Sequence, residues 1–390
     1  MLRVTQNVFL NNIRSQLSRG GLRLLTAQEQ VSTGRQINRP SDDPAGAFRV
    51  LNLRQLTAAN SQFERNIDSL DANLSVAENV LGQTQEVLYR TLELAIQAAN
   101  ASVDKSQRAM IATEVTQQLD EVKRLANTQL GARHLFAGYL SDRPPFVRDI
   151  DLAAGTGNAG SGTITAGTFD RDTVTSSRYQ VRFLDASTYE VSEIGTGLTT
   201  ASGAYTAGQP IDFDGQGNEI VIDGAPAAGD TFVITPRIGY VGDGNEIMVQ
   251  VGEGQAVAAN IHGHQFYLGD GNLDGVTDTG QVSVFAALED LKFALEDDDQ
   301  AAIQSVIDQV DGAVGQLSAG RGIIGGRLNL VDASKQDLSQ RNLTIEGLRS
   351  EIEDVDMAAA ITQLNQVESV FQATLGTAAR VLQRSLMDYL

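Results

Sequence analysis

One apolar residue recurs at every seventh position through the last third of the chain. Eight successive positions of this repeat are apolar: Ile303, Val310, Leu317, Ile324, Val331, Leu338, Ile345 and Ile352. A seven-residue repeat keeps one seam of a helix turned toward a partner helix along its whole length. Fifty such residues would extend roughly 75 Å at 1.5 Å per residue. The sequence therefore predicts a long coiled-coil-like helix, around which the rest of the chain must be arranged.

The seam of this predicted helix is narrow. Half of the companion positions between these apolar positions are polar, among them Arg321 and Asn342, so the helix needs several neighbours. Four glycines lie between residues 320 and 326. They predict either a break in the helix or a very close approach of another segment.

Two further helices are expected before residue 100. Residues 2–33 form an amphipathic pattern that should end at Gly34, and an extended connector follows because Pro40 keeps Arg39 out of the helical region. Ser41 offers an N-cap for the next helix, which should end near Asn100.

A shorter helix should follow that long one. Asp104 and Gln107 form a capping box at its start, its apolar face includes Leu130, and Gly131 should close it.

The middle of the chain has a different composition. Residues 141–284 hold 23 of the 38 glycines and carry 19 acidic residues against 6 Arg and no Lys. Short alternating runs at 179–184, 219–222, 231–234 and 247–251 predict strands separated by Gly-rich turns. The fold class expected is therefore mainly α, a helical rod built from both termini, with a small antiparallel β domain inserted.

Helical patterning resumes near Val282, and the apolar face rotates between residues 354 and 357. We read that rotation as a joint that mirrors the connector at 35–43. The predicted domains are 1–40 with 357–390, a terminal helical assembly domain; 41–140 with 285–356, a helical rod; and 141–284, an outer β domain.

Each terminal helix has an apolar stripe and nothing of its own to bury it against except the other helix. We predict that these stripes form an assembly interface and that both termini order on assembly, because an unburied stripe does not offset the entropy of ordering. The predicted interface residues are Leu2, Phe9, Ile13, Leu17, Leu24, Val31, Ile361, Leu364, Val367, Phe371, Leu375, Ala378 and Leu382.

Composition excludes several classes of function. A net charge of −20 argues against nucleic acid as a partner, no stretch of eighteen apolar residues predicts a membrane span, and the absence of cysteine excludes disulfides and thiolate sites. The N-terminus shows no secretory signal pattern, and its basic, acid-poor character leaves a transit peptide as an alternative.

Four segments resemble the flagellin superfamily. They are STGRQINRPSDDPAG (32–46), LELAIQAAN (92–100), IEDVDMAAAITQL (352–364) and VLQRSLMDYL (381–390), and the likeness covers roughly 1–140 and 285–390. Within the superfamily, NRPSDDPAG, HLFAGY (134–139) and the SLMDYL ending look like the hook–filament junction proteins; the alternative is a flagellin that forms the filament itself.

The resemblance implies a structural adaptor of the extracellular flagellum, exported unfolded through the type III channel. The partners it implies are the proximal hook-associated junction protein, flagellin, a cytosolic export chaperone and other copies of the chain in a ring or short helical layer. It implies no cofactor, no nucleic acid and no membrane insertion.

Three features of the sequence admit another interpretation. The terminal stripes suit the core of a monomeric bundle less well. His262 and His264 would share one face of a strand, as surface histidines or as a metal pair. The segment from Asp270 to Gln281 follows an EF-hand loop except at its last position, and a Gly- and Asp-rich turn explains it equally well. No catalytic motif stands out, so we predict that the chain is not an enzyme.

Overall fold

A computed structural model describes residues 2–387, with the side chains of 2–7, 9, 10 and 381–387 left out of the description. The chain forms two compact units. The first combines both ends, up to Arg65 and from Ala333 onward, and the second comprises residues 66–332.

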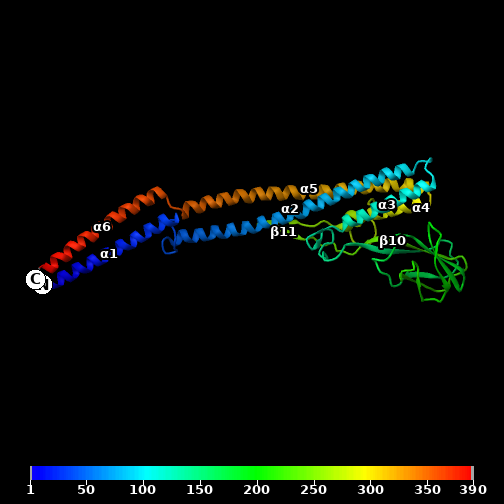
Figure 1. Cartoon of the computed structure of the whole chain (residues 1–390), viewed down its shortest axis with the longest axis horizontal. Helices are drawn as coiled ribbons and strands as arrows, with labels where there is room; N and C mark the ends of the chain where they lie inside the picture. Colours follow the sequence, from blue (N-terminus) through cyan, green and yellow to red (C-terminus); the bar gives the residue numbers. More distant parts are fainter. Residues whose placement is uncertain (1, 388–390) are drawn as a thin grey trace. The chain divides into compact units, whose positions relative to one another are not determined.

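The first unit is helical. It contains α1 (Leu2–Thr33), the beginning of α2 (Pro44–Ala98), the end of α5 (Gln300–Glu353) and α6 (Met357–Met387), and α1 lies beside α6 (Figure 1). Helix α1 ends where the sequence predicts, with Gly34 at a φ of +70°. Only glycine adopts that conformation without strain.

The start of α2 differs from the prediction. Asp43, rather than Ser41, caps the helix, because its carboxylate accepts the amide of Ala45 at 3.1 Å and its carbonyl accepts the amide of Ala47 at 2.8 Å. Pro44 then occupies the first helical position, where a missing N–H costs nothing. Asp42 instead accepts the amides of Asn38 and Arg39 and fixes the connector.

In the second unit, α3 (Lys105–Ala126) begins with the predicted capping box of Asp104 and Gln107. It ends at Ala126 rather than at Gly131, so the assignment of Leu130 to its face is wrong. The Asn127 side chain accepts from the Phe146 amide at 2.9 Å and donates to the Phe146 carbonyl at 2.8 Å. This pairing turns the chain into a hairpin of β1 (Gln129–Leu130) and β2 (Arg133–His134).

The predicted heptad helix is α5, and it is unbroken. The first six of its eight seam residues, from Ile303 to Leu338, are buried, whereas Ile345 and Ile352 are half-buried. Gly320 serves a close approach, because a Cβ there would lie 2.8 Å from a ring carbon of Phe266. Gly322, Gly325 and Gly326 have open space beside them.

The inserted region is antiparallel, as expected, but divides into three sheets. The largest has the order β3-β10-β5-β6-β7, the second β4-β9-β8 and the third β11-β12. The strands are β3 (Phe146–Ala154), β4 (Thr163–Ala166), β5 (Tyr179–Asp185), β6 (Thr188–Glu193), β7 (Thr199–Ala204), β8 (Pro210–Asp212), β9 (Glu219–Asp223), β10 (Thr231–Tyr240), β11 (Met248–Gly252) and β12 (Gln255–Ala258).

The first two sheets share one core. Val181, Val191, Ile220 and Phe232 are fully buried in it, and Phe183 packs edge-on against Phe232 with ring centroids 5.9 Å apart. A short π-helix, η1 (His264–Leu268), and α4 (Val284–Glu296) then lead from the β region back to α5. Ser283 caps α4 by accepting the amide of Ala286.

Candidate assembly site at the paired terminal helices

Helices α1 and α6 form an antiparallel pair with an apolar seam. Phe371 of α6 lies over the two adjacent glycines of α1, so that a Cβ on Gly20 would be 3.1 Å from its ring and one on Gly21 would be 3.8 Å away. Ala27 and Ala360 are buried in the same seam. Small residues on one helix thus make room for an aromatic ring on the other.

Most of the predicted interface residues that the structure describes lie at or beside this seam. Ile13, Leu17, Leu24, Val31, Leu364, Val367 and Phe371 are half-buried and Ala378 is buried, whereas Ile361 and Leu375 stay exposed. Leu2, Phe9 and Leu382 fall outside the described side chains. These residues therefore face the partner helix of the same chain, and their role as an interface between copies stays a prediction.

A second apolar stripe on α1 is not among the predicted interface residues. Val8, Leu22 and Leu25 are 55%, 62% and 62% exposed. At 100° per residue they lie within about 100° of arc: Val8 and Leu22 are roughly 140–180° from the seam residues Leu17 and Leu24, and Leu25 is roughly 80–100° from them. A helix with apolar residues on two opposite faces is suited to burial between neighbours on both sides. The pattern could have been found by testing for two stripes instead of one.

The connectors at the two joints pair with each other. Arg35 and Asp354 form an antiparallel bridge, in which the Gln36 amide donates to the Glu353 carbonyl at 2.7 Å and the Val355 amide to the Gly34 carbonyl at 2.9 Å. The Glu353 carboxylate is 4% exposed and contacts Arg35 at 3.1 Å and Arg54 at 2.5 Å. The connector at residues 35–43 and the joint at residues 354–357 therefore contact each other directly.

The EF-hand-like loop is held by its own amides. Asp270 accepts from Gly275 at 2.9 Å, and Asp278 accepts from Gly271 at 2.8 Å. Among the described residues, no group of three or more His, Asp or Glu side chains is placed to hold a metal ion. The arrangement is that of a turn rich in Gly and Asp.

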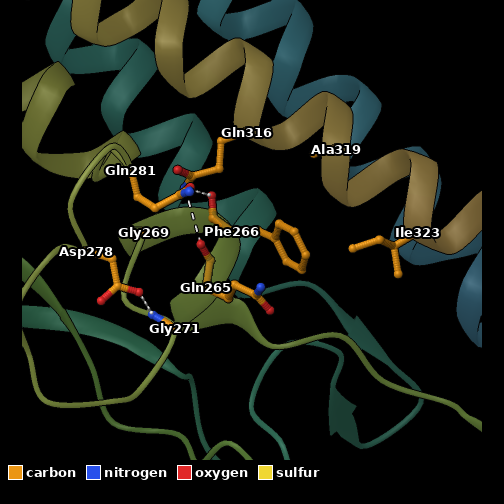
Figure 2. A pocket seen from close by; sticks show the side chains of 9 residues that line it. All are labelled: Gln265, Phe266, Gly269, Gly271, Asp278, Gln281, Gln316, Ala319 and Ile323. Carbon is orange, nitrogen blue, oxygen red and sulfur yellow. Dashed lines mark hydrogen bonds between the residues drawn. The ribbon is translucent and has the colours of Figure 1, made fainter.

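Gln316 of α5 forms hydrogen bonds with the segments on both sides of the loop from Asp270 to Gln281 (Figure 2). Its amide nitrogen donates to the carbonyls of Gln265, Phe266 and Val282 at 3.0–3.2 Å, and its oxygen accepts the Val282 amide at 3.1 Å. A cavity of about 220 Å³ lies beside it, with Ile323 on the α5 side and Asp278 on the loop side.

The histidine pair differs from the prediction. His262 lies outside any strand and His264 opens η1, so the two do not lie along a strand face. His264 is only 2% exposed, hence not a surface residue, and its ring stacks on His262 with centroids 5.4 Å apart. Burial, together with the charge of His264, lowers the pKa of His262.

One buried carboxyl group stands out in the second unit. Glu289 of α4 lies 3.4 Å from Arg237 of β10, and burial raises the pKa of Glu289 to about 7 against the opposing effect of that guanidinium. Perturbed carboxyl groups can act as acids or bases in enzymes, but they also occur in structural ion-pair networks. Arg237 also contacts Asp290 at 2.8 Å, so Glu289 belongs to an ion-pair network.

The chain resembles known flagellar proteins at both ends and in the middle. The bacterial flagellin N-terminal helical region matches residues 4–141, and the C-terminal helical region matches 307–390. A D2-like domain of flagellar hook-associated protein 1 matches 153–236.

Two relatives are named flagellar hook-associated protein 3. The one from Escherichia coli K12 is 32% identical over 37% of this chain and 46% of its own length. The one from Salmonella typhimurium LT2 is 33% identical over 35% and 42%. The chain thus spans less than half the length of these relatives.

A solved structure described as a flagellar hook-associated protein from Vibrio parahaemolyticus is similar in fold. It has a TM-score of 0.52 at 17% identity and covers 80% of this chain and 100% of its own.

Within residues 2–387 no helix is long and apolar enough to cross a membrane. The relatives are structural flagellar proteins rather than enzymes. With both terminal helical regions of flagellin at its two ends, the chain belongs to the flagellin family.

Proposed function

We propose that the chain is the adaptor that joins hook to filament in the bacterial flagellum. The observation that carries this is the combination of flagellin-type terminal regions with a middle segment like that of a hook-associated protein. The relatives named flagellar hook-associated protein 3 support the same role. The location that follows is the extracellular flagellum, at the junction.

In this proposal residues 1–40 with 357–390 enter the helical core of the assembly, 41–140 with 285–356 form the surrounding rod, and 141–284 face outward. The predicted interface residues are supplemented by Val8, Leu22 and Leu25, whose side chains are more than half exposed within one chain. Burying an exposed leucine stabilises an assembly by about 2 kcal/mol. The exposed stripe on each α1 would therefore contribute at every subunit of a layer.

The proposed partners are the proximal hook-associated junction protein on one side and flagellin on the other. A cytosolic export chaperone would hold the C-terminal region before export, and copies of the chain would associate in a ring or short helical layer. The exposed Leu375 and Val370 on α6 offer apolar surface for such contacts.

The test uses isolated hooks that already carry the proximal junction protein. Purified chain is added with and without flagellin, and the product is measured by electron microscopy and mass per length. A single short layer that allows flagellin to extend is the expected result. Long filaments of this chain alone would make it a flagellin instead, and an absence of binding would overturn both roles.

A further inference from the structure

Two stacked histidine rings in the second unit have buried Nε2 atoms. The planes of the His262 and His264 rings are inclined by 20°. The Nδ1 atom of His264 bonds to the Asp270 carbonyl, which can only accept, so this nitrogen carries the proton. Among the described residues neither Nε2 atom has a hydrogen-bond partner, although both are shielded from solvent. A proton added to Nε2 of His262 would therefore be a buried donor without an acceptor, which is costly.

Groups that oppose a positive charge lie on two sides of His262. Arg327 of α5 is one of them, and the stacked ring of His264 is the other. Tyr240 of β10, whose ring centroid is 5.4 Å from that of His264, stays an uncharged phenol because burial raises its pKa. A protonated His262 would thus be repelled both by α5 and by the ring stacked on it.

The two carboxylates near His262 are already engaged by other groups. Asp243, in the loop after β10, accepts two backbone amides at 3.0 and 2.9 Å. Glu246 of the same loop contacts Arg327 at 3.4 Å. Burial of the imidazole outweighs the attraction of these carboxylates, so the pKa of His262 lies below its ordinary value of 6.5.

The same arginine links the hairpin of β11 and β12 to α5. Arg327 donates to the carbonyls of Ala258 and Asn260 at 3.3 and 2.6 Å. The Asn260 side chain in turn donates to the Asn245 carbonyl at 2.8 Å and accepts the Ile247 amide at 2.7 Å. Both ends of the hairpin are therefore held through one guanidinium group.

The hairpin depends on such contacts for its order. Within the described chain its two strands pair only with each other, and an isolated two-stranded hairpin is marginally stable in water. Asn66 of α2 donates to the Gln250 carbonyl of β11 at 2.9 Å, and Val251 and Val257 are buried. Loss of the link to α5 should thus expose the backbone amides of the hairpin.

We propose that the stacked pair of His262 and His264 makes the attachment of the β11–β12 hairpin to α5 sensitive to acid. At neutral pH the rings stack and Arg327 holds the hairpin. Because the pKa of His262 is lower in the closed state than in an open one, the open state takes up a proton more readily, and it gains population as pH falls below about 6.5. The contact lies within one chain, so it is independent of the proposed role at the junction.

The test is hydrogen exchange of residues 247–260 at pH 7.5 and pH 5.0, corrected for the intrinsic exchange rate at each pH. The open fraction of the hairpin in the wild type should be about threefold or more larger at pH 5.0. Protonation of Glu289 stabilises the fold as pH falls, so it cannot cause this increase. Equal protection of the hairpin at both pH values would overturn the proposal.

The variant His262→Gln removes the titrating ring and keeps a polar side chain. Its open fraction at pH 5.0 should stay within about twofold of that at pH 7.5. His134→Gln is the matched control, because both ring nitrogens of His134 already have partners, and it should respond to pH as the wild type does. A wild-type response in His262→Gln would overturn the role of His262.

A second measurement on the wild type does not depend on how the variants fold. The chain has three histidines, and their ring signals can be followed by NMR between pH 8 and pH 5 after selective ¹³C labelling. The His262 signal should titrate over the same range below about 6.5 in which the hairpin opens. Opening of the hairpin while His262 stays neutral, or titration of His262 while the hairpin stays protected, would overturn the proposal.

Discussion

The ring of Phe371 lies so close to Gly20 that a Cβ on the glycine would be 3.1 Å from it. This pairing joins the last helix of the chain to the first. Phe371 is half-buried, so its removal should cost about 1–2 kcal/mol, less than the 3–5 typical of a fully buried Phe.

Phe371→Ala should therefore loosen the pair of α1 and α6. Hydrogen exchange of the amides from Ile13 to Val31 is expected to be about 5–30 times faster than in the wild type. Val370→Ala is the matched control, because Val370 is 59% exposed and should leave exchange unchanged. Equal rates in all three proteins would show that this contact does not hold the helices together.

Glu289→Gln should change how stability depends on pH. The folded-state pKa of Glu289, about 7, lies above its unfolded value near 4.5. The folded protein therefore binds more protons between these values, and the stability that protonated Glu289 provides is lost as pH rises toward 7. Calorimetric unfolding should show that the free energy of unfolding of the variant, relative to that of the wild type, rises by up to about 3 kcal/mol between pH 5 and pH 9.

The control for this prediction is Glu253→Gln, at the exposed turn between β11 and β12. Its effect on the free energy of unfolding should be the same at pH 5 and at pH 9. A difference between Glu289→Gln and the wild type that stays constant with pH would mean that Glu289 is ionised throughout.

Asp230→Asn should destabilise the β region at neutral pH. The Asp230 carboxylate accepts the amides of Ala227, Ala159 and Gly160 at 2.7–3.1 Å, and these bonds, that of Ala227 foremost, lower its pKa. Because the folded-state pKa is depressed, its contribution is present above the unfolded value and is lost as pH falls through the folded one. The melting temperatures of wild type and variant should thus converge below about pH 4.

Asp151→Asn, at an exposed position of β3, is the comparison for this variant and should melt as the wild type does at pH 7. If Asp230→Asn matched it there, the three amides would not need a charged acceptor.

Gly138→Ala and Gly131→Ala separate backbone strain from crowding. The two glycines have φ values of +69° and +65°, so alanine costs each about 1 kcal/mol. At Gly138 a Cβ would also lie 2.5 Å from the backbone oxygen of Asp243, whereas nothing lies within 4 Å at Gly131. We expect Gly138→Ala to lower the melting temperature by several degrees more than Gly131→Ala does. Equal losses would indicate that the loop around Asp243 moves aside.

The sequence predicted those features that depend on local chemistry or on a long regular repeat. Asp104 with Gln107 began a helix as expected because a capping box acts within four residues. The seam from Ile303 to Leu338 was predictable because six apolar residues at successive seven-residue intervals rarely arise without a partner helix.

Features fixed by distant partners were not predictable. Helix α3 stops at Ala126 because Asn127 pairs with Phe146, nineteen residues away. Strand β7 contains Thr199, Ser202 and Gly203, a composition typical of loops, and becomes a strand through its register with β6. The second stripe on α1 was obscured because Leu22 and Leu25 alternate with the seam residues along the helix.

Glu353 offers two carboxylate oxygens to three guanidinium groups, since Arg349 lies 3.8 Å away in addition to Arg35 and Arg54. One donor can therefore let go while the others keep the charge neutralised. Such redundancy lets the connectors exchange partners without ever leaving the buried carboxylate bare, which would be costly. Loss of any single arginine therefore leaves the buried carboxylate with two cationic partners, whereas loss of Glu353 removes the acceptor that all three arginines share.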